Sequence, residues 1–138
     1  MDVRTRWRLV LALLAFSVLA GSGVAFYFTL QPRGDTGKVV VNGKDYYWDR
    51  LFQSFNTVRF TAGGESYIGV RLSDLINDTG LSNPENHRYR IRGSDGYEKE
   101  LSWDDMVCGY LVKEEKKTVF PNLTRSFWVR DVITIEVI

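Results

Sequence analysis

The residues whose types and spacing most suggest a ligand-binding site are three arginines at alternate positions of one short segment. Arg88, Arg90 and Arg92 alternate with Tyr89 and Ile91, so in a strand their guanidinium groups would share one face and could bind phosphate. A second charged segment, 98–100, follows the turn Ser94-Asp95-Gly96. The availability of the arginines for a ligand therefore depends on how the two segments pair.

Two hairpin registers compete at this turn. A two-residue Asp-Gly loop would set Arg92 opposite Lys99, whereas a three-residue loop with a left-handed Gly96 would set Arg92 opposite Glu98 and Arg90 opposite Glu100. An opposed pair of unlike charges contributes about 0.2–1 kcal/mol, and opposed like charges cost a similar amount. The second register is therefore favoured, and we expect a charge-balanced, solvated face rather than a phosphate site.

Other candidates for chemistry are few. His87 is the only histidine and Cys108 the only cysteine, so no internal disulfide is possible and a transition-metal site would consist mostly of carboxylates. We expect His87 on the surface at the start of an edge-like strand, and Cys108 as a small buried residue. The chain has no Cys-x-x-Cys, His-Glu-x-x-His, phosphate-loop or Gly-x-Ser-x-Gly motif.

Residues 1–30 predict the location of the protein. Residues 9–30 contain no charge and are long enough to cross a bilayer, while the basic tail 1–8 predicts that the N-terminus stays cytoplasmic. A cleaved signal peptide is the alternative, with Val18 and Ala20 preceding the cleavage point. We expect a single-pass signal-anchor helix at the cell membrane. From residue 9 onward 15 Lys and Arg face 16 Asp and Glu, so nothing indicates nucleic-acid binding.

A linker at 31–37 leads to one extracytoplasmic domain at 38–138. Its first turn, Asn42-Gly43, predicts a tight β-hairpin, and the alternation in 57–62 predicts a half-buried strand. A long final strand is expected over 127–138. The fold class is therefore α+β: a mixed or antiparallel sheet, or a small partly closed barrel, with two or three short helices.

The helices are predicted from their end signals. Ser73 is the expected N-cap of a helix that ends at Gly80, where a left-handed residue is favoured. Asp49 is the expected cap of an earlier helix. Ser102 and Asp105 have the spacing of a capping box for a third.

The order of several motifs resembles a known family. These are Gly69-Val70-x-Leu72-x-x-Leu75, Gly80, Asp95-Gly96-Tyr97 and Leu101-Ser102, flanked by Val41-Asn42-Gly43, Trp128-Val129 and Ile135-Glu136-Val137. Nearly all of 38–138 is similar in this respect to the molybdopterin-binding domain of the sulfite-oxidase-like oxidoreductases. The resemblance implies that domain's fold and a pterin-linked molybdenum cofactor.

The chain departs from this family at the metal. The family places a molybdenum-ligating cysteine just before the Gly-Val motif, and the matching stretch 59–64 contains none. Thr61 and Ala62 cannot replace a soft thiolate. The cofactor-holding loop that follows the position of Lys117 in the family is also shortened. We infer a shortened relative that keeps the scaffold and lacks the cofactor.

Two function classes follow. The first is a membrane-anchored binding or interaction domain for an extracytoplasmic protein or small molecule, and the second is an oxidoreductase or redox-complex subunit that binds molybdopterin. The candidate ligand-binding residues, carried over from the fold of the family, are Tyr67, Arg71, Asp95, Tyr97, Trp103 and Arg125. Each also has a purely structural interpretation, with Asp95 as a turn residue and with Tyr97 and Trp103 as packing residues. No catalytic or metal-binding residue is predicted.

Overall fold

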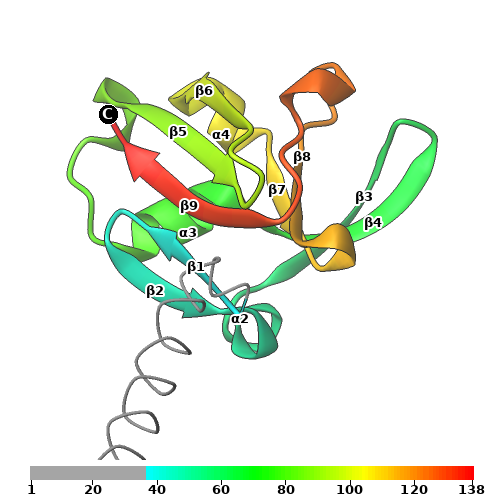
Figure 1. Ribbon diagram of the computed structural model, residues 1–138, viewed down its shortest axis with the longest axis horizontal. Helices are drawn as coiled ribbons and strands as arrows, with labels where there is room; N and C mark the ends of the chain where they lie inside the picture. The colour runs from blue at the N-terminus through cyan, green and yellow to red at the C-terminus, as the bar shows by residue number, and fades with distance from the viewer. Residues whose placement is uncertain (1–36) are drawn as a thin grey trace, which may run out of the picture. The chain divides into compact units, whose positions relative to one another are not determined.

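The computed structural model describes residues 37–138, so the expected basic tail and anchor helix, and all but the last residue of the linker, lie outside the described residues. In the described part, no helix is long and apolar enough to cross a membrane. Residues 37–138 form an α+β domain with three short α-helices (Figure 1). The expected fold class is thus confirmed at this level.

The strands divide between two sheets, a division that the sequence did not indicate. The five-stranded mixed sheet has the order β2-β1-β9-β5-β6, and the four-stranded antiparallel sheet has the order β3-β4-β7-β8. No ladder joins the two sheets in the described residues, so they do not close into the partly closed barrel that was the alternative expectation. The strands are β1 (Lys38–Val41), β2 (Lys44–Tyr47), β3 (Thr57–Ala62), β4 (Glu65–Arg71), β5 (Arg88–Gly93), β6 (Glu98–Ser102), β7 (Tyr110–Val112), β8 (Lys117–Val119) and β9 (Val132–Val137).

The β5–β6 register is confirmed. Arg92 lies opposite Glu98 and Arg90 opposite Glu100, and both pairs form salt bridges, at 2.9 and 3.0 Å. Gly96 has a φ of +86°, the left-handed conformation that the three-residue loop requires. However, β5 lies inside the sheet between β9 and β6, so His87 does not open an edge strand as expected.

The three α-helices differ in how they begin. The capping box at α4 (Trp103–Val107) is confirmed, with Ser102 and Asp105 bonding reciprocally. The predicted caps Ser73 and Asp49 are wrong, because each lies inside the first turn of its helix, α3 (Leu72–Asp78) or α2 (Trp48–Ser54). Both of these helices follow a strand without a break. The strand therefore sets the start of the helix, and no side chain caps it.

The final strand is shorter than expected. Strand β9 begins at Val132, because Asp131 has a φ of +48° and breaks the extended conformation. Phe127 ends the short 3-10 helix η3 (Arg125–Phe127) instead of opening the strand. Two further 3-10 helices are η1 (Pro84–Asn86) and η2 (Glu114–Lys116).

One main core joins the two sheets and the helices. It contains Val70 and Leu111 of the four-stranded sheet, Ile91 and Ile135 of the five-stranded sheet, and the buried faces of α2, α3 and α4. A second, smaller cluster covers the other face of the four-stranded sheet. It comprises the buried residues Ala62, Tyr67, Val112 and Val119, with Phe60, Tyr110 and Trp128 packed against them. The β3–β4 hairpin, which carries part of this cluster, extends away from the five-stranded sheet (Figure 1).

The β5–β6 turn yields a prediction for Asp95→Ala. The Asp95 carboxylate accepts a hydrogen bond from the Tyr97 amide at 3.0 Å, so its removal should lower the free energy of unfolding by about 0.5–1.5 kcal/mol. Chemical denaturation of the full chain in detergent micelles, followed by tryptophan fluorescence, measures this change. Asp95→Asn keeps the acceptor oxygen and is the control. An unchanged free energy of unfolding in Asp95→Ala would show that Asp95 is not a turn-stabilising residue.

Candidate functional site

The six predicted site residues do not converge on one place. Tyr67 of β4 and Arg125 of η3 both pack against Trp128. Asp95 and Tyr97 lie in the β5–β6 turn, with the Tyr97 hydroxyl donating to the carbonyl oxygen of Ser126. The other two lie apart from these groups: Arg71 ends β4 and is exposed, and Trp103 begins α4 and packs on Tyr89.

A row of aromatic rings crosses the four-stranded sheet. The Phe60 ring stacks on Tyr110, with centroids 3.9 Å apart, and also lies 5.7 Å from Tyr67. Strand β4 runs between β3 and β7, and Gly69 occupies the position where a side chain would block this contact. A Cβ there would lie 3.1 Å from the Tyr110 Cβ and 2.9 Å from the Leu111 carbonyl oxygen. Gly69 thus allows Tyr110 to reach across β4.

Charged groups surround the end of this row. We call Glu65, Tyr67, Lys117, Arg125 and Trp128 the Tyr67 cluster. The Lys117 ammonium lies 5.1 Å from the Tyr67 ring centroid and 5.6 Å from that of Trp128, and the Arg125 guanidinium lies 5.3 Å from Trp128. The Lys117 side chain is only 12% exposed. Both cations are therefore held on aromatic faces, where cation–π attraction is favourable.

The Tyr67 hydroxyl lies between the Glu65 carboxylate and the Lys117 ammonium group and bonds to both. It donates to Glu65 Oε2 at 2.7 Å and accepts from the Lys117 ammonium at 3.5 Å. The bond from Tyr67 lowers the pKa of Glu65, and the positive charges of Arg125 and Lys117 lower it further. The same bond, together with burial, raises the pKa of Tyr67. The pKa values of both groups are thereby moved further from neutral pH.

Arg125 also holds the tip of the β3–β4 hairpin. Its guanidinium donates to the Gly63 carbonyl oxygen at 2.8 Å. Gly63 has a φ of +58°, so the backbone conformation favours glycine there. The tip of the hairpin is therefore hydrogen-bonded, through Gly63, to the segment that precedes Trp128.

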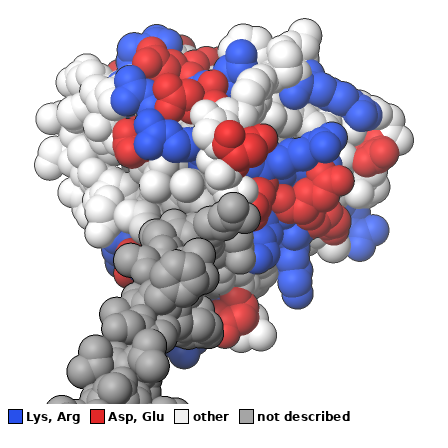
Figure 2. All heavy atoms as spheres, viewed as in Figure 1, with Lys and Arg blue, Asp and Glu red and all other residues white. Residues whose placement is uncertain are grey.

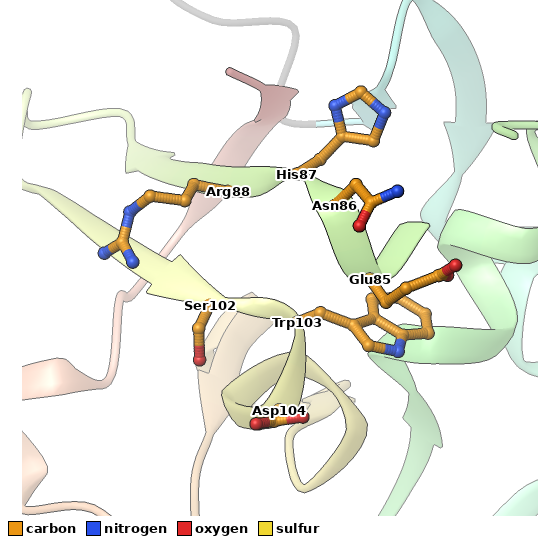
Figure 3. Close-up of a pocket in the computed structure, with 7 residues that line it drawn as sticks. All are labelled: Glu85, Asn86, His87, Arg88, Ser102, Trp103 and Asp104. Atoms are coloured by element: carbon orange, nitrogen blue, oxygen red, sulfur yellow. The ribbon is translucent and has the colours of Figure 1, made fainter. Parts of the chain in front are cut away.

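A separate hollow lies beside Trp103. It has a volume of about 240 Å³ and is lined by Glu85, Asn86, His87, Arg88, Ser102, Trp103 and Asp104 (Figure 3). Figure 3 shows the His87 ring pointing away from Trp103 and Asp104. The titratable side chains thus diverge. The hollow could take a small polar group, but it offers no paired acid and base.

Groups of metal ligands are absent from the part of the chain that the structure describes. Within residues 37–138, no three His, Cys, Asp or Glu side chains gather as a metal site would require. The prediction that Cys108 is buried is wrong, because it follows the last turn of α4 and is exposed. Figure 2 shows Lys and Arg interspersed with Asp and Glu on the visible face, in keeping with the paired arginines of β5.

Sequence reasoning found two members of the Tyr67 cluster and missed three. Glu65 could have been found, because it lies two residues from Tyr67 in a strand and so shares its face. Lys117 and Trp128 carried no local signal that they approach Tyr67. Their approach depends on the pairing of β4, β7 and β8.

Comparison with known proteins gave no match: no family model, curated protein or solved structure is detectably similar to this chain. The interpretation of the site therefore rests on its own geometry.

The cluster yields a prediction for Tyr67→Phe. Loss of the hydroxyl should raise the pKa of Glu65 toward its ordinary value of 4.5, as measured by an NMR titration of the full chain in detergent micelles. Because the pKa of Glu65 is lowered in the folded state, the bond stabilises the protein above the ordinary glutamate range, and this contribution is lost as the pH falls through the lowered pKa. The stability difference between wild type and Tyr67→Phe should therefore shrink on acidification.

Tyr110→Phe is the matched control for this titration, since it removes a hydroxyl from the same aromatic row but not the one bonded to Glu65. If the Glu65 pKa were equal in wild type and Tyr67→Phe, the proposed link between the two residues would be refuted.

Proposed function

We propose that this chain is a membrane-anchored extracytoplasmic binding or interaction domain that resembles the molybdopterin-binding domain of sulfite-oxidase-like enzymes and carries no cofactor. In this proposal residues 9–30 form the anchor, the N-terminus is cytoplasmic, and the partner is an extracytoplasmic protein or small molecule. No nucleic acid is involved.

The observation that carries the proposal is the set of side chains in the hairpin segment 59–64 and the contacts that they make. In the family that the chain resembles, this segment supplies the thiolate that holds molybdenum. Here Thr61 is exposed, Ala62 packs into the second cluster, and Arg125 bonds to Gly63. The segment offers no soft ligand, and Cys108 lies on another element, at the end of α4. The residues present therefore do not fit the cofactor.

The Tyr67 cluster is the part of the candidate surface that the geometry supports best. It combines aromatic rings with Arg125, residue types that are enriched at protein interfaces, and it also holds Lys117 and Glu65. Tyr97 extends this surface, since it is 41% exposed and bonds to Ser126 beside Arg125. Arg71 and Trp103 lie outside it, and Asp95 serves the turn.

Elemental analysis tests the absence of a cofactor. Full-length protein purified from its native host should contain no stoichiometric molybdenum or tungsten and should release no fluorescent pterin, because no thiolate is placed to hold the metal. The native host matters, since a foreign host need not supply the cofactor. Stoichiometric metal with pterin would instead support the oxidoreductase alternative, and Cys108→Ser would then be the first variant to analyse.

The exposed single cysteine tests the location. A membrane-impermeant maleimide should label Cys108 of the full chain in intact cells, because the domain is expected outside the membrane and Cys108 is accessible. Cys108→Ser should abolish the label. Thr5→Cys in the Cys108→Ser background should be labelled only after permeabilisation. Labelling of Cys108 that also required permeabilisation would place the domain inside the cell and overturn this part of the proposal.

A further inference from the structure

The sheet edges in residues 37–138 are protected unequally against pairing with another chain. Edge strand β6 carries the charged run Glu98–Glu100, and β2 carries Lys44 and Asp45. The free side of β8 is covered, because the Thr118 amide donates to the Val129 carbonyl oxygen at 2.9 Å. Charges and covering segments are the usual means by which proteins block edge-to-edge association.

Strand β3 has the least protection of the four edge strands, since no described segment covers it and it carries a single charge. Its sequence, Thr-Val-Arg-Phe-Thr-Ala, holds one charge and no proline, and its residues favour strands. Among the described residues, only β4 pairs with it. Ile68, which lies opposite Arg59 on β4, is 46% exposed and adds an apolar contact beside this edge. The strand also belongs to the hairpin that extends away from the five-stranded sheet (Figure 1).

The turn determines which backbone groups of β3 face outward. Gly63 and Gly64 both have positive φ, so they form a two-residue turn whose hydrogen bond joins Ala62 and Glu65. Hydrogen-bonded and non-bonded pairs then alternate along an antiparallel ladder. The N–H and C=O groups of Thr57, Arg59 and Thr61 therefore point away from β4. The same alternation, carried across β4 and β7, directs the Thr118 amide outward from β8, where it bonds to Val129.

We propose that β3 pairs antiparallel with β3 of a second copy of this chain, so that the two four-stranded sheets join into one. A two-fold axis perpendicular to the sheet keeps the aromatic faces of the two copies on the same side. Since each pairing uses both free β3 edges, the assembly closes at two copies and does not extend into a fibre.

Charge selects the register of this pairing. Only the odd-numbered residues of β3 have N–H and C=O groups that point away from β4. Two symmetric registers bond these groups to those of the second copy and pair most of the strand. One opposes Arg59 to Arg59 of the second copy, which places like charges together. The other opposes Arg59 to Thr61, Val58 to Ala62 and Phe60 to Phe60 on the axis. The second register is favoured, and it continues the row of Phe60, Tyr67 and Tyr110 rings from one copy to the next.

The test is a charge series at Thr61, which is exposed and therefore tolerates substitution. Sedimentation of the full chain in mild detergent over a range of concentrations should show a monomer–dimer equilibrium. In Thr61→Lys each new lysine lies opposite Arg59 of the other copy, so the dimer contains two pairs of like charges. Its association constant should fall roughly 2- to 30-fold, and in Thr61→Glu it should rise by a similar factor. Arg59→Glu combined with Thr61→Lys again opposes unlike charges and should strengthen the dimer as Thr61→Glu does.

Ser66→Lys is the matched control. It places the same charge on the same face but on β4, one strand from the edge, and should leave the dimer constant unchanged. Three results would overturn the proposal. The first is a wild-type protein that stays monomeric at every concentration. The second is a dimer that is equally strong in Thr61→Lys and Thr61→Glu, which would indicate contact through another segment. The third is a monomer that binds a foreign peptide along β3.

Discussion

The structure depends on Tyr67 and Val70, which are buried on opposite faces of the central part of β4. Val70 points into the main core, while Tyr67 points into the second cluster, and both are almost fully buried. A strand buried on two faces must have a sheet neighbour on each side, and β3 and β7 fill these positions. The approach of β7 in turn requires Gly69, where any Cβ would crowd the backbone of Leu111. The position of the Tyr67 cluster is therefore a consequence of how β4 is packed.

Parts of the fold that depend on local chemistry were predictable from the sequence. The β5–β6 register followed from pairing two arginines with two glutamates across one turn, and the capping box of α4 followed from the spacing of Ser102 and Asp105. In both cases the interacting groups are close in the sequence, so few arrangements compete. The left-handed Gly80 after α3 belongs to the same class.

Other features could not be predicted, because they depend on contacts between distant segments. A hydrogen bond from the Asn42 amide to the Ile135 carbonyl oxygen joins the first hairpin to the last strand, and only such long-range pairing divides the strands into two sheets. Asp131 leaves the extended conformation while its own amide bonds to Glu115. Cys108 is exposed because it caps the end of α4, although apolar residues surround it in the sequence. Of the candidate site, only Tyr67 and Arg125 were found, for the same reason.

The Tyr67 cluster is held together by interactions among neighbouring polar and aromatic groups. Its groups satisfy one another: Lys117 bonds to Tyr67, Tyr67 to Glu65, and Arg125 to the backbone of Gly63. These interactions lower the pKa of Glu65 and raise the pKa of Tyr67. Of these groups Arg125 is exposed, whereas Tyr67 and the Lys117 side chain are only 6% and 12% exposed. The cluster therefore acts as packing that joins β4, β8 and η3 through the rings of Tyr67 and Trp128.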